Sequence, residues 1–253
     1  MGVLDRFRLD GKVAIVTGAS SGLGVAFAQA LAEAGADLAI GARREERLSA
    51  TGALIEAAGR SYVACRTDVT KPEDCEALVS AAMERFGRVD ILVNNAGIGT
   101  AVPATKETPD QYREVIDINL MGAYWMAQAF ARANKTGGAI VNISSVLGLR
   151  PQGLPQAAYA SSKAGLIGLT RDLAAQWTGR KGIRVNALAP GFFPSEMSDE
   201  LPKDMVELMK QFTPAGRLGE PEELAATLIW LVSDAASYVT GITVPVDGGL
   251  VMP

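Results

Sequence analysis

The chain has 253 residues and a formal net charge of −4; 48% of its residues are hydrophobic and 21% are charged. These values are typical of a protein with a large core, and the acidic balance argues against nucleic-acid binding, which normally needs a basic patch. Histidine is absent. This excludes a Ser-His-Asp triad, a Cys-His pair and a histidine-ligated zinc, so proton transfer has to use Tyr, Lys, Cys or carboxylates.

Cysteine usage and the N-terminus indicate a protein of the cytoplasm. Cys65 and Cys75 are too few for a disulfide framework or a four-thiolate site, so we expect both to be reduced and structural. Residues 1–11 are charged and contain no apolar run of signal length, and no stretch approaches the ~18 apolar residues of a membrane span. We expect no metal, no nucleic-acid partner and no membrane association.

Short apolar runs alternate with segments of helical periodicity along the chain. We predict strands at 12–17, 38–41, 62–65, 89–93, 139–143, 183–188 and 243–246. We predict helices at 23–34, 45–58, 72–86, 109–133, 157–177 and 222–233. This alternation predicts an α/β protein with a three-layer doubly wound Rossmann fold and a parallel sheet of about seven strands. We expect one domain over 1–253, with an irregular loop at about 191–221 that serves function.

A glycine-rich turn follows the first predicted strand and opens the first predicted helix. It reads TGASSGLG and carries Gly18, Gly22 and Gly24. Glycines let a backbone approach a pyrophosphate, and free N–H groups at a helix start favour its negative charge. The turn therefore predicts dinucleotide binding, although a glycine-rich turn without a ligand is the alternative for this motif alone.

Two further motifs fall where an open α/β sheet binds ligands or does chemistry. Asn94-Asn95-Ala96-Gly97 follows the fourth predicted strand, where a simple Asn/Gly turn is the alternative. Tyr159 and Lys163 are spaced i, i+4, so the phenol and the ammonium share one helix face. A surface tyrosine beside a solvated lysine is the alternative for that pair.

With these motifs the sequence resembles the short-chain dehydrogenase/reductase family over about residues 9–249, and the motifs occur in the same order as in that family. The shared features are TGASSGLG at 17–24, Asp68, NNAG at 94–97, Asn119, Ser145, YASSK at 159–163, Pro190-Gly191 and VDGG at 246–249. One departure is visible. The family commonly has a Thr after Pro-Gly to bond the nicotinamide carboxamide, and this chain has Ser195, which keeps the hydroxyl, beside Pro194.

The resemblance implies a catalytic set and a cofactor site. Tyr159 would be the acid/base, Ser145 would hold the substrate oxygen, Lys163 would bond the ribose hydroxyls, and Asn119 would support a water relay to Lys163. The implied cofactor-binding residues are Gly18, Ser20, Ser21, Gly22, Leu23, Gly24, Arg43, Asp68, Val69, Asn95, Ala96, Gly97, Tyr159, Lys163, Pro190, Gly191 and Ser195. The resemblance also implies a homotetramer with helices 109–133 and 157–177 in one interface.

Electrostatics explains why a lysine should stand beside the tyrosine. A free Tyr has a pKa near ~10, too high for efficient proton transfer at neutral pH. An ammonium ~5 Å away at an effective dielectric of ~20 contributes ~3.3 kcal/mol, or ~2.4 pK units. We therefore expect Lys163 to lower the pKa of Tyr159.

The end of the second predicted strand favours NADP(H), with NAD(H) possible. An NAD enzyme usually places an acidic residue there to accept the 2′-hydroxyl. This chain instead has Ala42, followed by Arg43, whose guanidinium can form two bonds to a 2′-phosphate, with Arg44 close behind. The alternative is that the arginines begin a solvated helix and pair with the glutamates that follow. Ser21 stands where many NADP-using relatives carry a basic residue, which weakens the prediction.

The predicted loop suggests a neutral, moderately apolar ketone or secondary alcohol as substrate. Its apolar residues are Phe192, Phe193, Met197, Leu201, Met205, Leu208, Met209 and Phe212, and it has no arginine pair to clamp a carboxylate or phosphate. NAD-dependent oxidation of a polyol or sugar and reduction of a 3-oxoacyl thioester stay open, as does a lid that packs on its own core. Two other classes also stay open: a dinucleotide-sensing regulator, and an epimerase or dehydratase like the family's extended relatives.

Overall fold

The computed structural model describes residues 2–194 and 203–252, which form alternating strands and helices. The strands are β1 (Val13–Thr17), β2 (Asp37–Ala42), β3 (Tyr62–Arg66), β4 (Ile91–Asn94), β5 (Gly138–Ile143), β6 (Ile183–Pro190) and β7 (Thr243–Val246). The helices are α1 (Gly22–Glu33), α2 (Leu48–Ala57), α3 (Pro72–Phe86), α4 (Pro109–Ile116), α5 (Gly122–Ala133), α6 (Ala157–Lys181), α8 (Lys203–Phe212) and α9 (Pro221–Val232).

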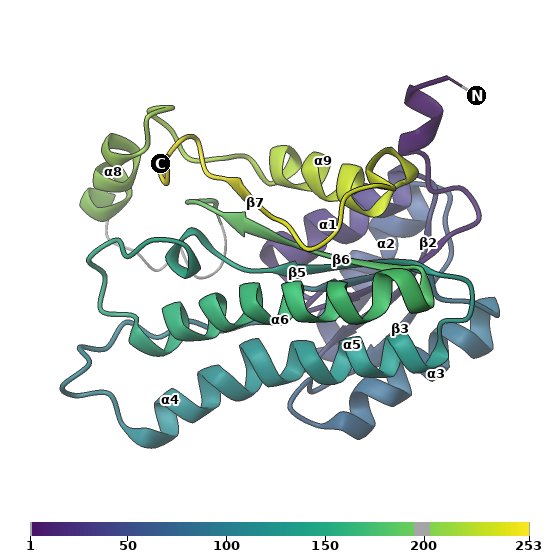
Figure 1. Ribbon diagram of the computed structural model, residues 1–253, viewed down its shortest axis with the longest axis horizontal. Coiled ribbons are helices and arrows are strands. Elements are labelled where there is room, and N and C mark those ends of the chain that lie inside the picture. The colour runs from purple at the N-terminus through teal and green to yellow at the C-terminus, as the bar shows by residue number, and fades with distance from the viewer. Residues whose placement is uncertain (1, 195–202, 253) are drawn as a thin grey trace.

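Within the described residues the strands form one parallel sheet of seven strands in the order β3-β2-β1-β4-β5-β6-β7. Helices α1, α2 and α9 lie on one side of the sheet, and α3, α5 and α6 lie on the other (Figure 1). The predicted doubly wound, three-layer Rossmann architecture is therefore confirmed. Because the strand order reverses between β1 and β4, a ligand crevice is expected at the carboxyl ends of these two strands.

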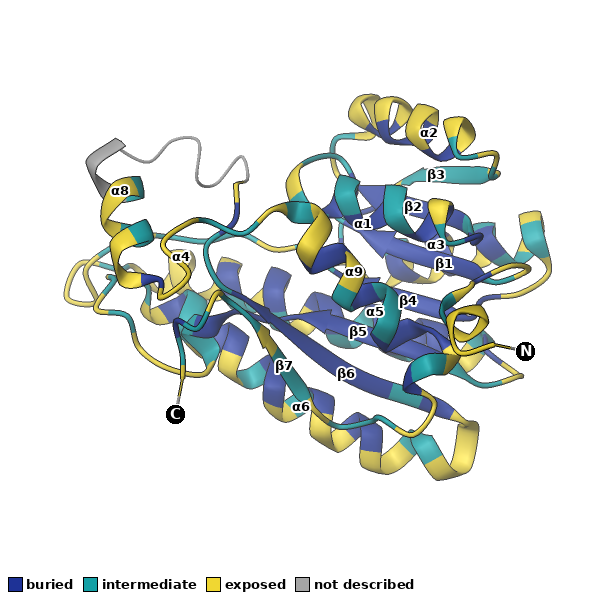
Figure 2. Cartoon of the chain, turned by 90° about the horizontal axis from the view of Figure 1, so that it is seen from above, coloured by how far each residue is buried: buried dark blue, intermediate teal, exposed yellow. Residues whose placement is uncertain are grey.

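Burial on both faces explains why the strands are continuous apolar runs rather than alternating ones. All five residues of β1 are buried; Ala14 and Val16 pack toward α1 and α9, and Ile15 packs toward α3 and α5. Figure 2 shows β1, β4, β5 and β6 almost wholly buried, while the outward faces of the helices are exposed. The sheet is thus the rigid element on which the carboxyl-end loops are mounted.

Four predicted boundaries need correction. The predicted helix 45–58 begins with a 3₁₀ turn, Glu45–Arg47, before α2, and the helix predicted at 157–177 continues to Lys181, where Gly182 ends it with φ +66°. The helix predicted at 109–133 is interrupted by a π turn, Asp117–Met121. The stretch 191–221, predicted to be irregular, contains α8; its Met205, Leu208, Met209 and Phe212 follow helical spacing, a signal that the loop interpretation overlooked.

Within the described residues no helix is long and apolar enough to cross a membrane.

Candidate functional site

Ser145, Tyr159 and Lys163 converge at the carboxyl end of β5. Ser145 lies two residues beyond β5 and is 7% exposed, and its hydroxyl accepts a hydrogen bond from Leu147 N at 3.2 Å. Tyr159 lies in the first turn of α6 and Lys163 one turn later, so both side chains share a face. The side chains of Ser145 and Tyr159 are hydrogen-bonded, and Lys163 Nζ lies 5.5 Å from the centroid of the Tyr159 ring.

Two reciprocal hydrogen bonds fix Lys163 against the end of β5. Its Nζ donates to Ile143 O at 2.8 Å, and the hydroxyl of Ser144 donates to Lys163 O at 2.9 Å. A Cβ on Gly148 would lie 2.7 Å from the backbone carbon of Lys163, so only glycine lets this loop reach the helix so closely. Ser144 and Gly148 were missed in the sequence analysis, because neither carries a recognisable chemical motif.

Burial moves the pKa values of Tyr159 and Lys163 in opposite directions. It raises the pKa of Tyr159 above its usual value of 10.0, and the hydrogen bond to Ser145 lowers it only in part. The expectation that Lys163 brings the pKa of Tyr159 below its ordinary value is therefore wrong for the protein without a cofactor. The reason is that desolvation disfavours the phenolate, and the ammonium is directed at Ile143 O.

Burial also lowers the pKa of Lys163 from 10.5 to about 8. Between these values Lys163 binds a proton in the unfolded chain but not in the native chain, so its own contribution to the free energy of unfolding should rise with pH across this window, by ~1–3 kcal/mol. In denaturant unfolding, the free energy of unfolding of the native sequence minus that of Lys163→Met should therefore increase across this pH range.

Lys181→Met is the matched control for that experiment. Lys181 lies on the same helix and also donates to a backbone carbonyl, Ala131 O at 3.0 Å, but it is exposed. The free energy of unfolding of this variant should follow the same pH dependence as that of the native sequence. Burial raises the pKa of Cys75 to about 12, which lowers stability as pH rises above 9, equally in all three proteins. Parallel curves for the native sequence and Lys163→Met would contradict the lowered pKa of Lys163.

Asn119 lies in the π turn and connects two neighbouring segments. Its Oδ1 accepts from Ile98 N at 2.9 Å, and its Nδ2 donates to Ile98 O at 2.9 Å and to Ser162 Oγ at 3.0 Å. A Cβ on Gly97 would lie 3.2 Å from Asn119 Oδ1 and 3.4 Å from Lys163 Nζ. Asn119 therefore joins the loop after β4 to α6, and its Oδ1, which accepts one hydrogen bond within the described residues, keeps a second lone pair. The contact with Ser162 was not predicted.

The glycine turn lies between β1 and α1, at the point where the strand order reverses. Gly18 has φ +67°, and a Cβ there would lie 2.9 Å from Ala96 Cα. A Cβ on Gly24 would lie 2.2 Å from Gly18 O. Gly24 is thus required for the contact of α1 with the turn itself, in addition to the predicted approach of a ligand to the glycines.

Asn95 holds the turn from the neighbouring strand. Its Nδ2 donates to Thr17 O at 3.0 Å and to Gly18 O at 3.2 Å, while the Thr17 hydroxyl accepts from the amides of Asn95 and Ala96 at 3.1 Å each. These bonds join the carboxyl ends of β1 and β4, and so the TGASSGLG and NNAG motifs form one structure.

Arginines approach the same turn from the end of β2. Arg43 directly follows β2 and is exposed, and an N–H of Arg44 donates to Ser21 Oγ at 2.9 Å. Burial raises the pKa of Asp68, but hydrogen bonds from Thr70 and the nearby Arg43 outweigh it, so the pKa lies below 3.8. The structure brings Ser21, Arg43, Arg44 and Asp68 to one end of the crevice; the contact of Arg44 with Ser21 was not predicted.

Three of the remaining predicted cofactor residues lie at the carboxyl ends of the strands, and one lies outside the described residues. Val69 follows β3 and is buried, and its side chain lies so close to Gly122 that a Cβ there would be 2.6 Å from Val69 Cγ2. Pro190 ends β6. Gly191 approaches β7 so closely that a Cβ there would lie 2.7 Å from Asp247 Cα. Ser195 lies outside the described residues.

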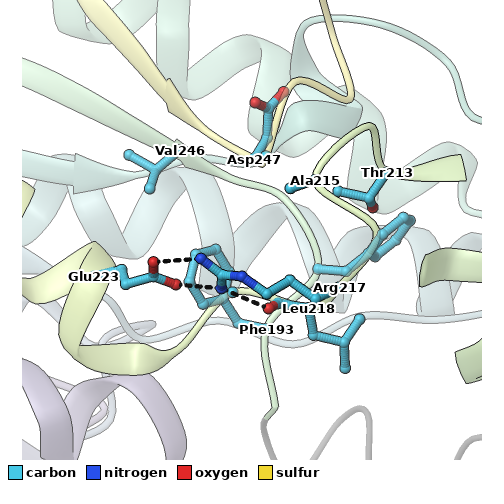
Figure 3. A pocket seen from close by; sticks show the side chains of 11 residues that line it. Phe193, Thr213, Ala215, Arg217, Leu218, Glu223, Val246 and Asp247 are labelled. Atoms are coloured by element: carbon cyan, nitrogen blue, oxygen red, sulfur yellow. Dashed lines mark hydrogen bonds and ion pairs between the residues drawn. The ribbon is translucent and has the colours of Figure 1, made fainter. Parts of the chain in front are cut away.

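The base of the loop that carries α8 is fixed around a small cavity of about 110 Å³ (Figure 3). Gly219 N donates to Phe192 O at 3.0 Å, and Ala215 N donates to Gly248 O at 3.0 Å. Arg217 forms two hydrogen bonds of 2.7 Å to the carboxylate of Glu223, at the start of α9, and these lie across the cavity in Figure 3. Within the described residues its lining comes from this base and from the ends of β6 and β7, so the cavity lies apart from Ser145 and Tyr159.

Comparison with known proteins gives the family. Residues 18–251 match the family described as Enoyl-(Acyl carrier protein) reductase. The galactitol 2-dehydrogenase (L-tagatose-forming) of Cereibacter sphaeroides is 42% identical over 252 residues, covering 96% of both chains. A short-chain type dehydrogenase/reductase from Mycobacterium marinum has a TM-score of 0.96 at 35% identity, with 100% of both chains covered. The chain is a short-chain dehydrogenase/reductase.

Another structural neighbour, a gluconate 5-dehydrogenase from Burkholderia cenocepacia J2315 in complex with NADP and tartrate, has a TM-score of 0.92 at 37% identity over 98% of both chains. The family resemblance predicted from the motifs is confirmed. As a short-chain dehydrogenase/reductase, the protein is an oxidoreductase of CH–OH and C=O groups, from a family that uses NAD(P).

Proposed function

We propose that the protein interconverts a ketone and a secondary alcohol with NADP(H), using Tyr159 as the acid/base. The observation that carries the proposal is the convergence of Ser145, Tyr159 and Lys163, with the Ser145–Tyr159 hydrogen bond and the ammonium 5.5 Å from the phenol ring. A dinucleotide-sensing regulator would not need this arrangement.

The crevice fits a dinucleotide. The carbonyls of Thr17 and Gly18 are bound from behind by Asn95, and α1 begins immediately after the turn, so its N-terminal amides are available to a phosphate. Gly18, Gly22, Leu23 and Gly24 would hold the diphosphate side; Ser20, Ser21, Arg43, Asp68 and Val69 the adenosine; and Asn95, Ala96, Gly97, Pro190, Gly191 and Ser195 the nicotinamide side.

The catalytic roles follow from hydrogen-bonding capacity. Ser145 holds the substrate oxygen, and Tyr159 gives a proton to that oxygen or removes it. Lys163 binds the ribose hydroxyls, and the free lone pair of Asn119 supports a water between it and Lys163. When bound, the dinucleotide supplies or accepts the hydride, and in its oxidised form it adds a positive charge that favours the phenolate.

A neutral, moderately apolar substrate is the class that the loop composition supports best. NAD-dependent oxidation of a polyol or sugar is the second candidate, supported by the 42% identity to a galactitol dehydrogenase. A 3-oxoacyl thioester is the third, suggested by the family resemblance. A cytoplasmic location, one domain over 1–253 and a homotetramer built on α4, α5 and α6 stay predictions.

The preference for NADP(H) is supported by the charges at the end of β2. Ala42 leaves no carboxylate to repel a 2′-phosphate, and Arg43 is exposed beside it. Arg44, bound to Ser21, brings a positive charge to the position where the sequence has serine instead of a basic residue. Arg44, two residues beyond β2, would thus take the place of the basic residue that is missing at position 21.

A charge-assisted hydrogen bond is worth ~1.5–3 kcal/mol, so kcat/KM for NADPH should exceed that for NADH by about 10- to 150-fold. Steady-state kinetics with one ketone and both cofactors measures this ratio. Ala42→Asp combined with Arg43→Leu should reverse it. Arg85→Leu is the control, because it removes an arginine from the last turn of α3, at the end of that helix distant from Asp68. This variant should leave the ratio of the two kcat/KM values unchanged. An equal or higher kcat/KM with NADH in the native sequence would refute the preference.

A further inference from the structure

Three successive carbonyls, at the end of β1 and in the turn after it, are bound by side chains from outside the turn. Asn95 binds Thr17 O and Gly18 O, and the hydroxyl of Thr51 donates to Ala19 O at 2.7 Å. Thr51 lies on α2, 32 residues from Ala19; the two residues are 1% and 0% exposed. The Thr51 hydroxyl is the partner of a buried carbonyl that water does not reach.

This bond fixes the direction of the next amide in the chain. The structure has no cis peptide bond among its described residues, and in a planar trans peptide the C=O and the N–H point in opposite directions. Since Ala19 O points at α2, the N–H of Ser20 points away from α2. The Ser20 amide makes no hydrogen bond within the described part of the chain, so its donor is available to a ligand.

The position of the Ser20 amide indicates which part of a ligand it meets. Its neighbour Ser21 accepts the hydrogen bond from Arg44, and Arg43 lies at the end of β2 beside them. An unpaired N–H one residue before the serine that binds Arg44 favours an anionic or strongly accepting oxygen. In the proposed orientation this end of the crevice holds the adenosine part of the dinucleotide.

We propose that Thr51 is a positioning residue for the cofactor: by holding Ala19 O, it presents the Ser20 N–H to the adenosine end of the dinucleotide. This inference rests on the proposed function. Thr51 itself touches no ligand, because its side chain is buried between α2 and the turn. Its loss frees the Ala19–Ser20 peptide to rotate and leaves a buried carbonyl without a donor.

Thr51→Val and Thr51→Ser test this with the smallest possible change. Valine keeps the volume and removes the hydroxyl, whereas serine keeps the hydroxyl. For Thr51→Val we expect the Kd for NADPH, measured by fluorescence titration, and the inhibition constant of 2′,5′-adenosine diphosphate to rise together by about 10-fold. The kcat at saturating cofactor should stay within about twofold, because Tyr159 and Lys163 are not displaced. Thr51→Ser should bind both ligands like the native sequence.

Thr178→Val separates this effect from a general loss of stability. The Thr178 hydroxyl also donates to a backbone carbonyl, Ile183 O at 3.2 Å, at the other edge of the sheet. This variant should lower the melting temperature and leave NADPH binding unchanged. Unchanged binding in Thr51→Val, or equal weakening in Thr51→Ser, would overturn the role of Thr51. Failure of the native sequence to bind NADPH or NADH would instead overturn the proposed function.

Discussion

Replacement of Tyr159 by phenylalanine is expected to lower kcat by ~10²–10⁴, the usual contribution of a positioned acid or base. The phenol is the group hydrogen-bonded to Ser145, so its removal takes away both the proton carrier and one contact to the substrate oxygen. The Kd for NADPH should stay within about threefold, because the ring and Lys163 remain in place. Single-turnover and steady-state kinetics with one ketone, together with NADPH titration, measure both quantities.

Tyr124→Phe is the control for that substitution. The Tyr124 hydroxyl accepts a weak hydrogen bond from Gln128 on α5 and lies outside the site. Its variant should keep native kcat. If Tyr159→Phe kept more than a tenth of native kcat with chemistry rate-limiting, Tyr159 would not be the proton carrier.

Lys163→Met is expected to have the second-largest effect, and on two quantities at once. The buried ammonium is aligned by Ile143 O and lies one helical turn from Tyr159. Its removal should lower kcat by at least ~10², because the phenolate loses a neighbouring positive charge. It should also raise the Kd for NADPH by about 10-fold or more, because the ribose hydroxyls lose a charged donor.

The control for Lys163→Met is a second lysine on the same helix, α6. Lys181→Met removes an ammonium from the far end of α6 and should change neither kcat nor Kd. A loss of kcat in Lys163→Met without a change in Kd would show that Lys163 does not bind the ribose. A change in Kd alone would remove it from the proton transfer.

The sheet and its crevice could be predicted because a strand that is buried on both faces has a continuous run of apolar residues. The segment KVAIVT and the glycine turn after it identify β1 and the start of α1 without further information. The i, i+4 spacing of Tyr159 and Lys163 likewise predicts that they share a face of α6, as they do.

Contacts between segments distant in the sequence could not be predicted in the same way. The bond of Arg44 to Ser21 spans 23 residues and that of Thr51 to Ala19 spans 32, and neither pair forms a motif. The π turn at Asn119 interrupts a helix whose periodicity looks continuous. The raised pKa of Tyr159 also depends on burial, which outweighs the pairwise attraction that could be estimated from spacing.

The most direct test of the central claim is the absorbance of reduced nicotinamide, followed while the native protein and Tyr159→Phe are offered a panel of ketones, sugars and 3-oxoacyl thioesters with NADPH. We expect the native protein to reduce at least one carbonyl compound with stoichiometric oxidation of NADPH, and we expect Tyr159→Phe to bind NADPH with little turnover. Tight binding of NADPH without turnover of any carbonyl compound, or of any alcohol with NADP⁺, would contradict it and would favour a dinucleotide-sensing regulator.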